Sequence, residues 1–125
     1  MKLTLLPVTR EGYNIIPRLE DRKLVLKLSG TFDMTSANAL QLYLDQVSTE
    51  ARRQQALELV IDVVDVYYLG SNCIKSFVTL TVGLQTGTAG LLLRVITNPR
   101  LDWQGRAFSV LARIAPQRVV VEQSP

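Results

Sequence analysis

The chain has 125 residues, of which 47% are apolar and 20% are charged, and its formal net charge at pH 7 is +3. This length fits one domain with its own core, and the composition is that of a folded globular protein rather than a disordered one. We read the small positive excess as spread along the chain, and such an excess does not predict nucleic-acid binding, which needs a concentrated basic face.

The near absence of two residue types further limits the catalytic and metal-binding functions that the chain could have. The sequence contains no histidine, and Cys73 is its single cysteine. The commonest general base and metal ligand is therefore missing, and neither an intrachain disulfide nor a thiolate zinc site is expected. The sequence also lacks a Walker loop and a dinucleotide-binding fingerprint. We expect no enzymatic activity, no metal and no cofactor, and a reducing compartment.

The sequence does not predict export or membrane insertion. The apolar stretch near the N-terminus is too short for a signal peptide, and no segment approaches the roughly 20 apolar residues of a membrane helix. We therefore expect a cytoplasmic protein that does not insert directly into a membrane.

The first 22 residues form an N-terminal extension of uncertain structure. Residues 2–6 and 13–18 are candidate short strands, separated by a turn at residues 10–12, and Pro7 and Pro17 would confine them to sheet edges or strand ends. A clearer strand follows at residues 23–29, where apolar and polar side chains alternate, and Gly30 is predicted to end it.

The remaining elements alternate between helices and strands. Helices are predicted at residues 35–53, 71–85 and 101–114, and strands at 57–64, 91–97 and 118–122. Asp33 or Thr35 is expected to cap the first helix, a loop is expected at 87–90, and Pro99 suits the first position of the last helix. In that helix, five side chains are expected to face the sheet: Trp103, Ala107, Val110, Leu111 and Ile114. The pattern predicts a single α/β domain over residues 1–125, with a mixed sheet of four to six strands and helices mainly on one face.

Ser71 is the most informative polar residue, because it follows a glycine and opens a helix. One interpretation is an N-cap serine that satisfies a backbone N–H of the first turn. The other is a phosphoacceptor, since a helix N-terminus tolerates a phosphate. The carboxylates are weaker signals. Asp62 and Asp65 are interpreted as polar residues that close a buried strand, and Asp33 and Asp62 would be a weak catalytic pair if adjacent strand ends brought them together.

Two stretches resemble the motifs of the STAS domain family, which includes bacterial anti-sigma factor antagonists. Residues 28–33, read as LSGTFD, are similar to a strand that ends in Gly, two variable residues and Asp. Residues 59–74 are similar to an apolar strand with Asp, a turn and then Asp-Ser-Ser-Gly. The turn at residues 98–99 resembles the one before the third helix of the family. The resemblance extends over about residues 23–122 and implies the STAS fold.

The resemblance also implies a function. Anti-sigma factor antagonists bind a serine kinase, which phosphorylates the first serine of the motif and thereby releases them, and a serine phosphatase reverses the modification. Ser71 matches that serine and Asp33 matches the aspartate of the first motif. The sequence departs from the motif at three positions, because Gly70 replaces the aspartate, Asn72 the second serine and Cys73 the glycine. We expect Cys73 to place a side chain where a glycine would let a partner approach.

We therefore expect a non-enzymatic module for signal transduction and transcription regulation, which binds a kinase of this type and is switched at Ser71. The expected partner-binding residues are Asp33, Thr35, Tyr68, Gly70, Ser71, Asn72 and Lys75. Tyr67 and Tyr68 are candidate anchors, although a place in the core is the alternative for each. The alternative function is a permanent STAS subunit of a larger complex, such as the cytoplasmic component of a lipid transporter, without phosphorylation. A homodimer is also left open.

Overall fold

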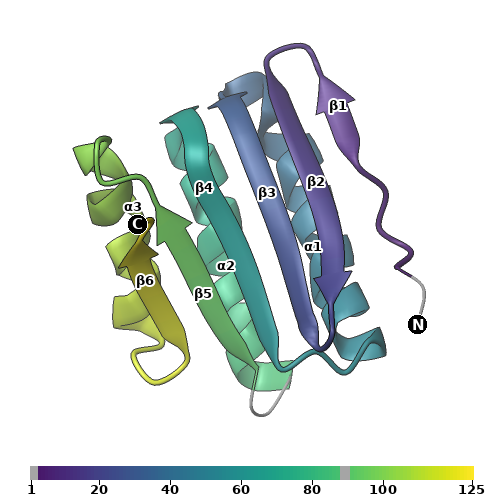
Figure 1. The fold of residues 1–125 in the computed structure, drawn as a ribbon. Helices are drawn as coiled ribbons and strands as arrows, with labels where there is room; N and C mark the ends of the chain where they lie inside the picture. Colours follow the sequence, from purple (N-terminus) through teal and green to yellow (C-terminus); the bar gives the residue numbers. More distant parts are fainter. Residues whose placement is uncertain (1–2, 88–90) are drawn as a thin grey trace.

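The computed structural model describes residues 3–87 and 91–125. It contains six strands, three α-helices and one 3-10 helix (Figure 1). In chain order these are β1 (Val8–Arg10), β2 (Tyr13–Glu20), β3 (Lys23–Phe32), η1 (Met34–Ser36), α1 (Ala37–Arg53), β4 (Glu58–Leu69), α2 (Ser71–Gly87), β5 (Leu92–Thr97), α3 (Asp102–Ile114) and β6 (Val119–Gln123).

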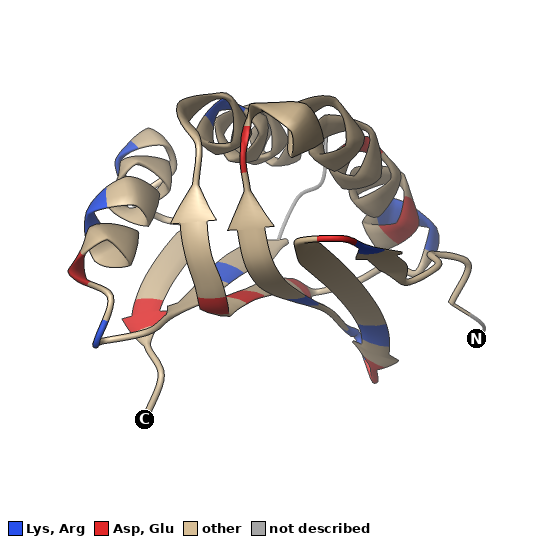
Figure 2. Ribbon diagram, turned by 90° about the horizontal axis from the view of Figure 1, so that it is seen from above, with Lys and Arg blue, Asp and Glu red and all other residues tan. Residues whose placement is uncertain are grey.

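The six strands form one mixed sheet whose spatial order follows the chain, β1 to β6. The pairs β1–β2 and β2–β3 are antiparallel, whereas β3, β4, β5 and β6 run parallel to one another. The three helices that connect the parallel strands all cover the same face, and the other face is left open (Figure 2). The predicted mixed sheet, covered by helices on one face, is confirmed.

The core lies between the sheet and the helices. Strand β3 places Leu24, Leu26 and Leu28 on this side, and each of these side chains is buried. On the helical side, Phe77 of α2 and Phe108 of α3 pack edge to face with their ring centroids 5.3 Å apart. The alternation of β3 and the spacing of the apolar residues on the helices therefore meet in a single core.

The N-terminal extension differs from its predicted structure. Among the described residues of the first candidate strand, 3–6, no strand forms, and β1 begins only after Pro7. Pro17 lies in the middle of β2, which is an interior strand of the sheet, although β1 pairs only with residues 13–15 of β2. The part of β2 that contains Pro17 therefore has a partner strand on one side only, where a missing N–H is tolerated.

Strand β3 continues past Gly30 to Phe32, so the prediction that Gly30 ends this strand is wrong. Gly30 has a φ of +97° and lies between two shifts of register against β4. A Cβ at this position would be 2.1 Å from the carbonyl oxygen of Gly12. Glycine is needed here because it lets the strand bend closely past the β1–β2 turn without being interrupted.

Two predictions for the region around α3 are also wrong in detail. Pro99 lies in the loop, since the helix begins at Asp102. Of the five side chains predicted to face the sheet, Leu111 is buried, and Trp103, Ala107 and Val110 are partly buried and pack against the core. The other two buried residues of α3, Gln104 and Phe108, were not predicted. In the loop predicted at 87–90, Gly87 is the last residue of α2 and positions 88–90 lie outside the described residues.

Candidate functional site

The candidate site lies where β3 and β4 end. These neighbouring strands are parallel, and their last residues pair, with Thr31 opposite Tyr68 and Phe32 opposite Leu69. The amide of Gly70 donates a hydrogen bond of 2.8 Å to the carbonyl oxygen of Phe32. Two segments that are far apart in the sequence, residues 31–35 and 67–75, each contain a strand end and the loop after it, and together they form one edge of the molecule. We call this surface the Ser71 edge.

Asp33 organises the first of these loops. Its exposed carboxylate accepts hydrogen bonds from the amide of Thr35 at 2.9 Å and from the hydroxyl of Thr35 at 2.6 Å. Asp33 is therefore the cap of η1. The prediction that Asp33 or Thr35 caps the first α-helix is wrong, because α1 begins at Ala37 and Ser36 occupies its cap position. The bond from the Thr35 hydroxyl, followed by that from its amide, holds the pKa of Asp33 below its usual value. The carboxylate is thus ionised at neutral pH, and Thr35 holds it in place.

Helix α2 begins at Ser71, and the residue in the cap position is Gly70. The carbonyl oxygen of Gly70 accepts hydrogen bonds from the amides of Cys73 and Ile74, at 3.0 and 3.1 Å. Ser71 is thus the first helical residue, which corrects its interpretation as an N-cap. Its side chain is exposed, and within residues 3–87 and 91–125 its hydroxyl has no hydrogen-bond partner. The hydroxyl is therefore free to meet solvent or another molecule.

Cys73 is buried, and its thiol lies 3.5 Å from the carbonyl oxygen of Asp33. The expectation that Cys73 obstructs an approaching partner is wrong, because the side chain points inward and connects the two loops. Burial raises the pKa of this thiol. The space around position 70 does not require a glycine, since a Cβ there would make an ordinary contact of 3.5 Å with the carbonyl oxygen of Phe32.

Three large apolar side chains are exposed on the Ser71 edge. Met34 is 79% exposed, Tyr67 is 62% exposed and Tyr68 is 55% exposed. The alternative that the two tyrosines belong to the core is therefore wrong. The sequence analysis did not single out Met34, although its position directly after Asp33 in the first motif was a signal. Exposed side chains of this kind are common anchors in protein interfaces.

The first turn of α2 adds polar groups to the same edge. Ser71, Asn72 and Lys75 are all exposed. Ser71 and Lys75 are four residues apart, so they lie on the same face of the helix. Among the ion pairs of the described residues, none involves Lys75. The structure therefore brings together all seven of the residues predicted for partner binding, and of these only Gly70 is buried.

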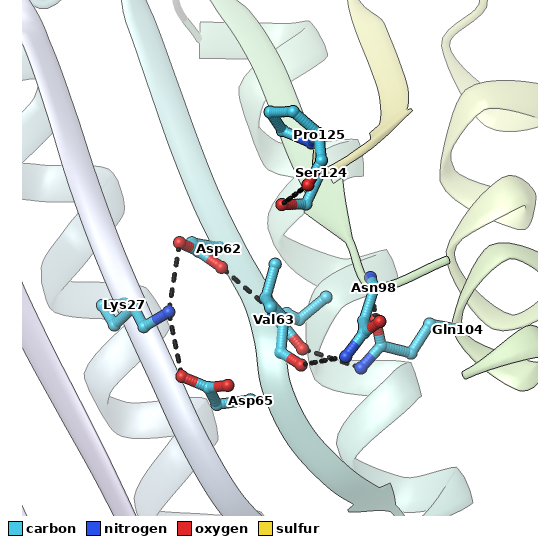
Figure 3. A network of polar contacts seen from close by, with 9 residues as sticks. Lys27, Asp62, Val63, Asp65, Asn98, Gln104, Ser124 and Pro125 are labelled. Carbon is cyan, nitrogen blue, oxygen red and sulfur yellow. Dashed lines mark hydrogen bonds and ion pairs between the residues drawn. The ribbon is translucent and has the colours of Figure 1, made fainter. Parts of the chain in front are cut away.

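The aspartates of β4 lie elsewhere. On the open face of the sheet, Lys27 contacts Asp62 at 3.4 Å and Asp65 at 3.1 Å (Figure 3). Burial lowers the pKa of Lys27, but the hydrogen bond that Lys27 donates to Asp65 and the charges of both aspartates outweigh this effect and raise the pKa. Asp62 lies opposite Lys27 in the sheet, and Lys27 precedes Asp33 by six residues. The hypothetical catalytic pair of Asp33 and Asp62 therefore does not form. The two β4 aspartates instead form ion pairs with Lys27.

Buried Gln104 of α3 supports the end of β4. The pairing of β4 with β5 ends at Asp62 and Ile96, so the following carbonyl groups of β4 need other partners. The Gln104 amide nitrogen donates to the carbonyl oxygen of Val63 at 2.7 Å (Figure 3) and to that of Val66 at 2.8 Å. Its oxygen accepts from the amide of Asn98 at 2.7 Å. Sequence analysis missed this residue, because a polar side chain in a buried position has no periodic signal.

In the part of the chain that the structure describes, no three residues among the histidines, cysteines, aspartates and glutamates are placed to hold a metal ion. None of the helices formed by the described residues has the length and apolar character needed to cross a bilayer.

Comparison with solved structures shows the fold that this arrangement defines. The anti-sigma factor antagonist of Mycobacterium paratuberculosis is 19% identical, with a TM-score of 0.66, over 90% of this chain and 88% of that one. The phosphorylated form of the Bacillus cell fate determinant SpoIIAA is 11% identical, with a TM-score of 0.57, over 86% and 89%.

A third similar structure is a chain from the complex of the diguanylate cyclase SiaD with its activator SiaC, from Pseudomonas aeruginosa. It is 16% identical, with a TM-score of 0.63, and the alignment covers 95% of this chain and 99% of that one. The fold is therefore that of the SpoIIAA-like proteins, and the resemblance to the STAS fold is confirmed. No protein-family model matches the sequence, and the comparison with curated proteins finds no match.

Proposed function

We propose that this chain is a non-enzymatic regulatory module that binds a partner protein through the Ser71 edge. The observation that carries the proposal is the exposed, unbonded hydroxyl of Ser71, which shares its edge with the exposed side chains of Met34, Tyr67 and Tyr68. The fold supports it, because similar structures include anti-sigma factor antagonists. The proposed partner is a serine kinase of the kind that such antagonists bind.

We further propose that phosphorylation of Ser71 weakens this interaction and that a phosphatase reverses it. A phosphoserine carries about −1.5 to −2 charges. The first turn of α2 offers free amide groups and the positive end of the helix dipole, and Lys75 lies one turn further along. The modified chain would stay folded, so the effect of the charge would fall on a partner packed over Ser71.

The experiment has two stages. A pull-down from a lysate of the native cells, with mass spectrometry, identifies the partner and tests Ser71 for phosphate. Calorimetry with that partner then compares Ser71→Asp with Ser71→Ala. We expect Ser71→Asp to weaken binding at least about tenfold, or roughly 1.4 kcal/mol, and Ser71→Ala to bind like the wild type. Equal affinities for the two folded variants would exclude the switch.

A second pair of variants tests the surface itself. Tyr68→Ala should weaken binding, because Tyr68 is an exposed anchor on the Ser71 edge. Leu57→Ala is the matched control, since Leu57 is also 55% exposed but precedes the opposite end of β4. Lys75→Glu should weaken binding as well. If Tyr68→Ala and Lys75→Glu leave the affinity unchanged, the partner binds elsewhere.

The second candidate function is a permanent subunit of a larger complex, bound through the same edge. The observation that favours it is the loss of three motif positions around Ser71, where Gly70, Asn72 and Cys73 stand. A permanent subunit would copurify with its complex in constant proportion and would carry no phosphate on Ser71. A regulated protein would instead show a phosphorylated fraction.

A further inference from the structure

The positive excess of the chain is concentrated in one segment, which corrects its interpretation as evenly spread. Residues 99–118 hold four of the 14 basic residues and one of the 11 acidic residues, so the rest of the chain holds ten of each. This segment contains α3 and the loops that flank it. The net charge of +3 is therefore the charge of this one part of the molecule.

The fold turns these charges outward. Helix α3 buries Gln104, Phe108 and Leu111 against the sheet, which directs Arg106 and Arg113 away from it. These arginines are seven residues apart, so they lie on one face at a separation of about 10.5 Å along the axis. Figure 2 shows basic segments along α3, at the left of the view, and in the loop before it, where Arg100 lies. Arg100, Arg106 and Arg113 are all exposed, and we call them the α3 arginine surface.

Four cations of β2, β3 and β5 form ion pairs with carboxylates of the sheet: Arg18, Lys23, Lys27 and Arg94. On the open face, Glu58 pairs with Lys23 at 3.5 Å and also with Arg94, which in turn contacts Glu122 at 3.1 Å. No ion pair among the described residues involves any member of the α3 arginine surface. Asp102 is the one acidic residue of α3. The surface thus presents three charges that the fold leaves without partners.

We propose that the α3 arginine surface binds an acidic segment of a partner protein. Guanidinium groups match carboxylates in charge and in their two-pronged geometry. Two arginines that lie two helical turns apart suit carboxylates that are spaced along a helical or extended segment. This surface does not include the Ser71 edge, and the proposal does not depend on the switch proposed there.

The observations favour an acidic protein segment over the other possible ligands. A second copy of the chain is a weaker match, since six of its 11 acidic residues already form ion pairs within their own fold: Glu20, Glu50, Glu58, Asp62, Asp65 and Glu122. Helices that bind anionic membranes also insert large apolar side chains into the lipid. None of the large apolar side chains that are exposed in the described residues belongs to α3. Single-stranded nucleic acid needs exposed aromatic rings, and the exposed tyrosines lie on β4.

Fluorescence anisotropy with a labelled glutamate-rich peptide tests the proposal on the full chain. The double variant Arg106→Glu/Arg113→Glu should bind the peptide at least about tenfold more weakly than the wild type. The control is Arg10→Glu/Arg52→Glu, which has the same net charge and alters exposed residues on β1 and α1. We expect its affinity to stay within about twofold of the wild type, because only a local effect distinguishes the two variants.

Chemical-shift mapping of the labelled protein adds a second measurement. Peptide-induced shifts in the backbone amides of α3 and the preceding loop would support the proposal. Equal losses of affinity in the two double variants would overturn it, because they would show that net charge alone attracts the peptide. Tighter binding of phosphatidylserine vesicles or of a DNA oligonucleotide than of the peptide, with the same dependence on Arg106 and Arg113, would also overturn it and assign the surface to those ligands.

Discussion

The amide of Gly70 and the carbonyl oxygen of Phe32 are joined by a hydrogen bond of 2.8 Å. This bond connects the residue after β4 to the last residue of β3, and so it fixes the start of α2 relative to the loop that contains Asp33. The cap of η1 and the exposed hydroxyl of Ser71 consequently belong to one surface. The site depends on the ends of two parallel strands more than on any single motif residue.

We predict that charge at position 71 changes the stability of the chain according to its sign. Ser71→Asp should raise the free energy of unfolding by about 0.3–1 kcal/mol, because a negative charge interacts favourably with the N-terminal end of a helix. Ser71→Lys is the matched control and should lower it by a similar amount. Urea denaturation measures both. If Ser71→Asp unfolds the chain, a phosphate at this position would disrupt the fold and the proposed switch would fail.

Gly30 and Gly12 form a second matched pair, because both have a φ of +97°. A Cβ at Gly12 would meet nothing within 4 Å, whereas one at Gly30 would lie 2.1 Å from the Gly12 carbonyl oxygen. We expect Gly12→Ala to cost about 1 kcal/mol of stability from backbone strain alone. Gly30→Ala should cost about 3 kcal/mol or more, because the β1–β2 turn must also move. Equal costs would mean that the close approach of this turn to β3 is not maintained in solution.

Gln104→Leu should destabilise the chain by about 3 kcal/mol. The substitution leaves the buried carbonyl groups of Val63 and Val66 and the amide of Asn98 without their partner, at about 1–3 kcal/mol for each unsatisfied group. Exposed Gln117→Leu is the control and should have little effect. Hydrogen exchange should also become faster at the end of β4. A change below about 0.5 kcal/mol in Gln104→Leu would refute the role assigned to this side chain.

Glu50 should make stability depend on pH. Its buried carboxylate accepts bonds from Arg53 at 2.8 Å, Gln54 at 2.9 Å and the amide of Thr4 at 3.1 Å. The bond from Arg53 in particular holds the pKa of Glu50 below its usual range, although burial opposes this. A lowered pKa in the folded state means that the carboxylate stabilises the fold fully above the unfolded value of about 4.3. This contribution is then lost as the pH falls through the folded pKa.

We therefore expect Glu50→Gln to lower the free energy of unfolding at neutral pH by about 1–3 kcal/mol. The difference from the wild type should remain constant down to about pH 5 and shrink in more acidic solution. Asp45→Asn, an exposed substitution on the same helix, is the control. Denaturation at a series of pH values gives both results. A difference that does not depend on pH would show that the charge of Glu50 is unimportant.

Local patterns in the sequence determined the elements of the fold. The alternation of Leu24, Leu26 and Leu28 predicted β3, and the spacing of apolar residues predicted the three helices, because each pattern follows from the geometry of its own backbone. Gly-Ser at the start of a helix likewise singled out Ser71. The order of these elements was enough to predict a mixed sheet with helices on one face.

Only the tertiary structure decided what happens where distant segments meet. Gly30 looks like the end of a strand, but its contact with the Gly12 turn makes it a bend within β3. Gln104 is buried because β4 extends beyond its pairing with β5 and leaves carbonyl groups that only α3 reaches. Cys73 points inward because the Asp33 loop covers it. Burial and hydrogen bonding depend on neighbours that are distant in the chain, such as Val63 and Gln104, which are 41 residues apart, and local periodicity does not record them.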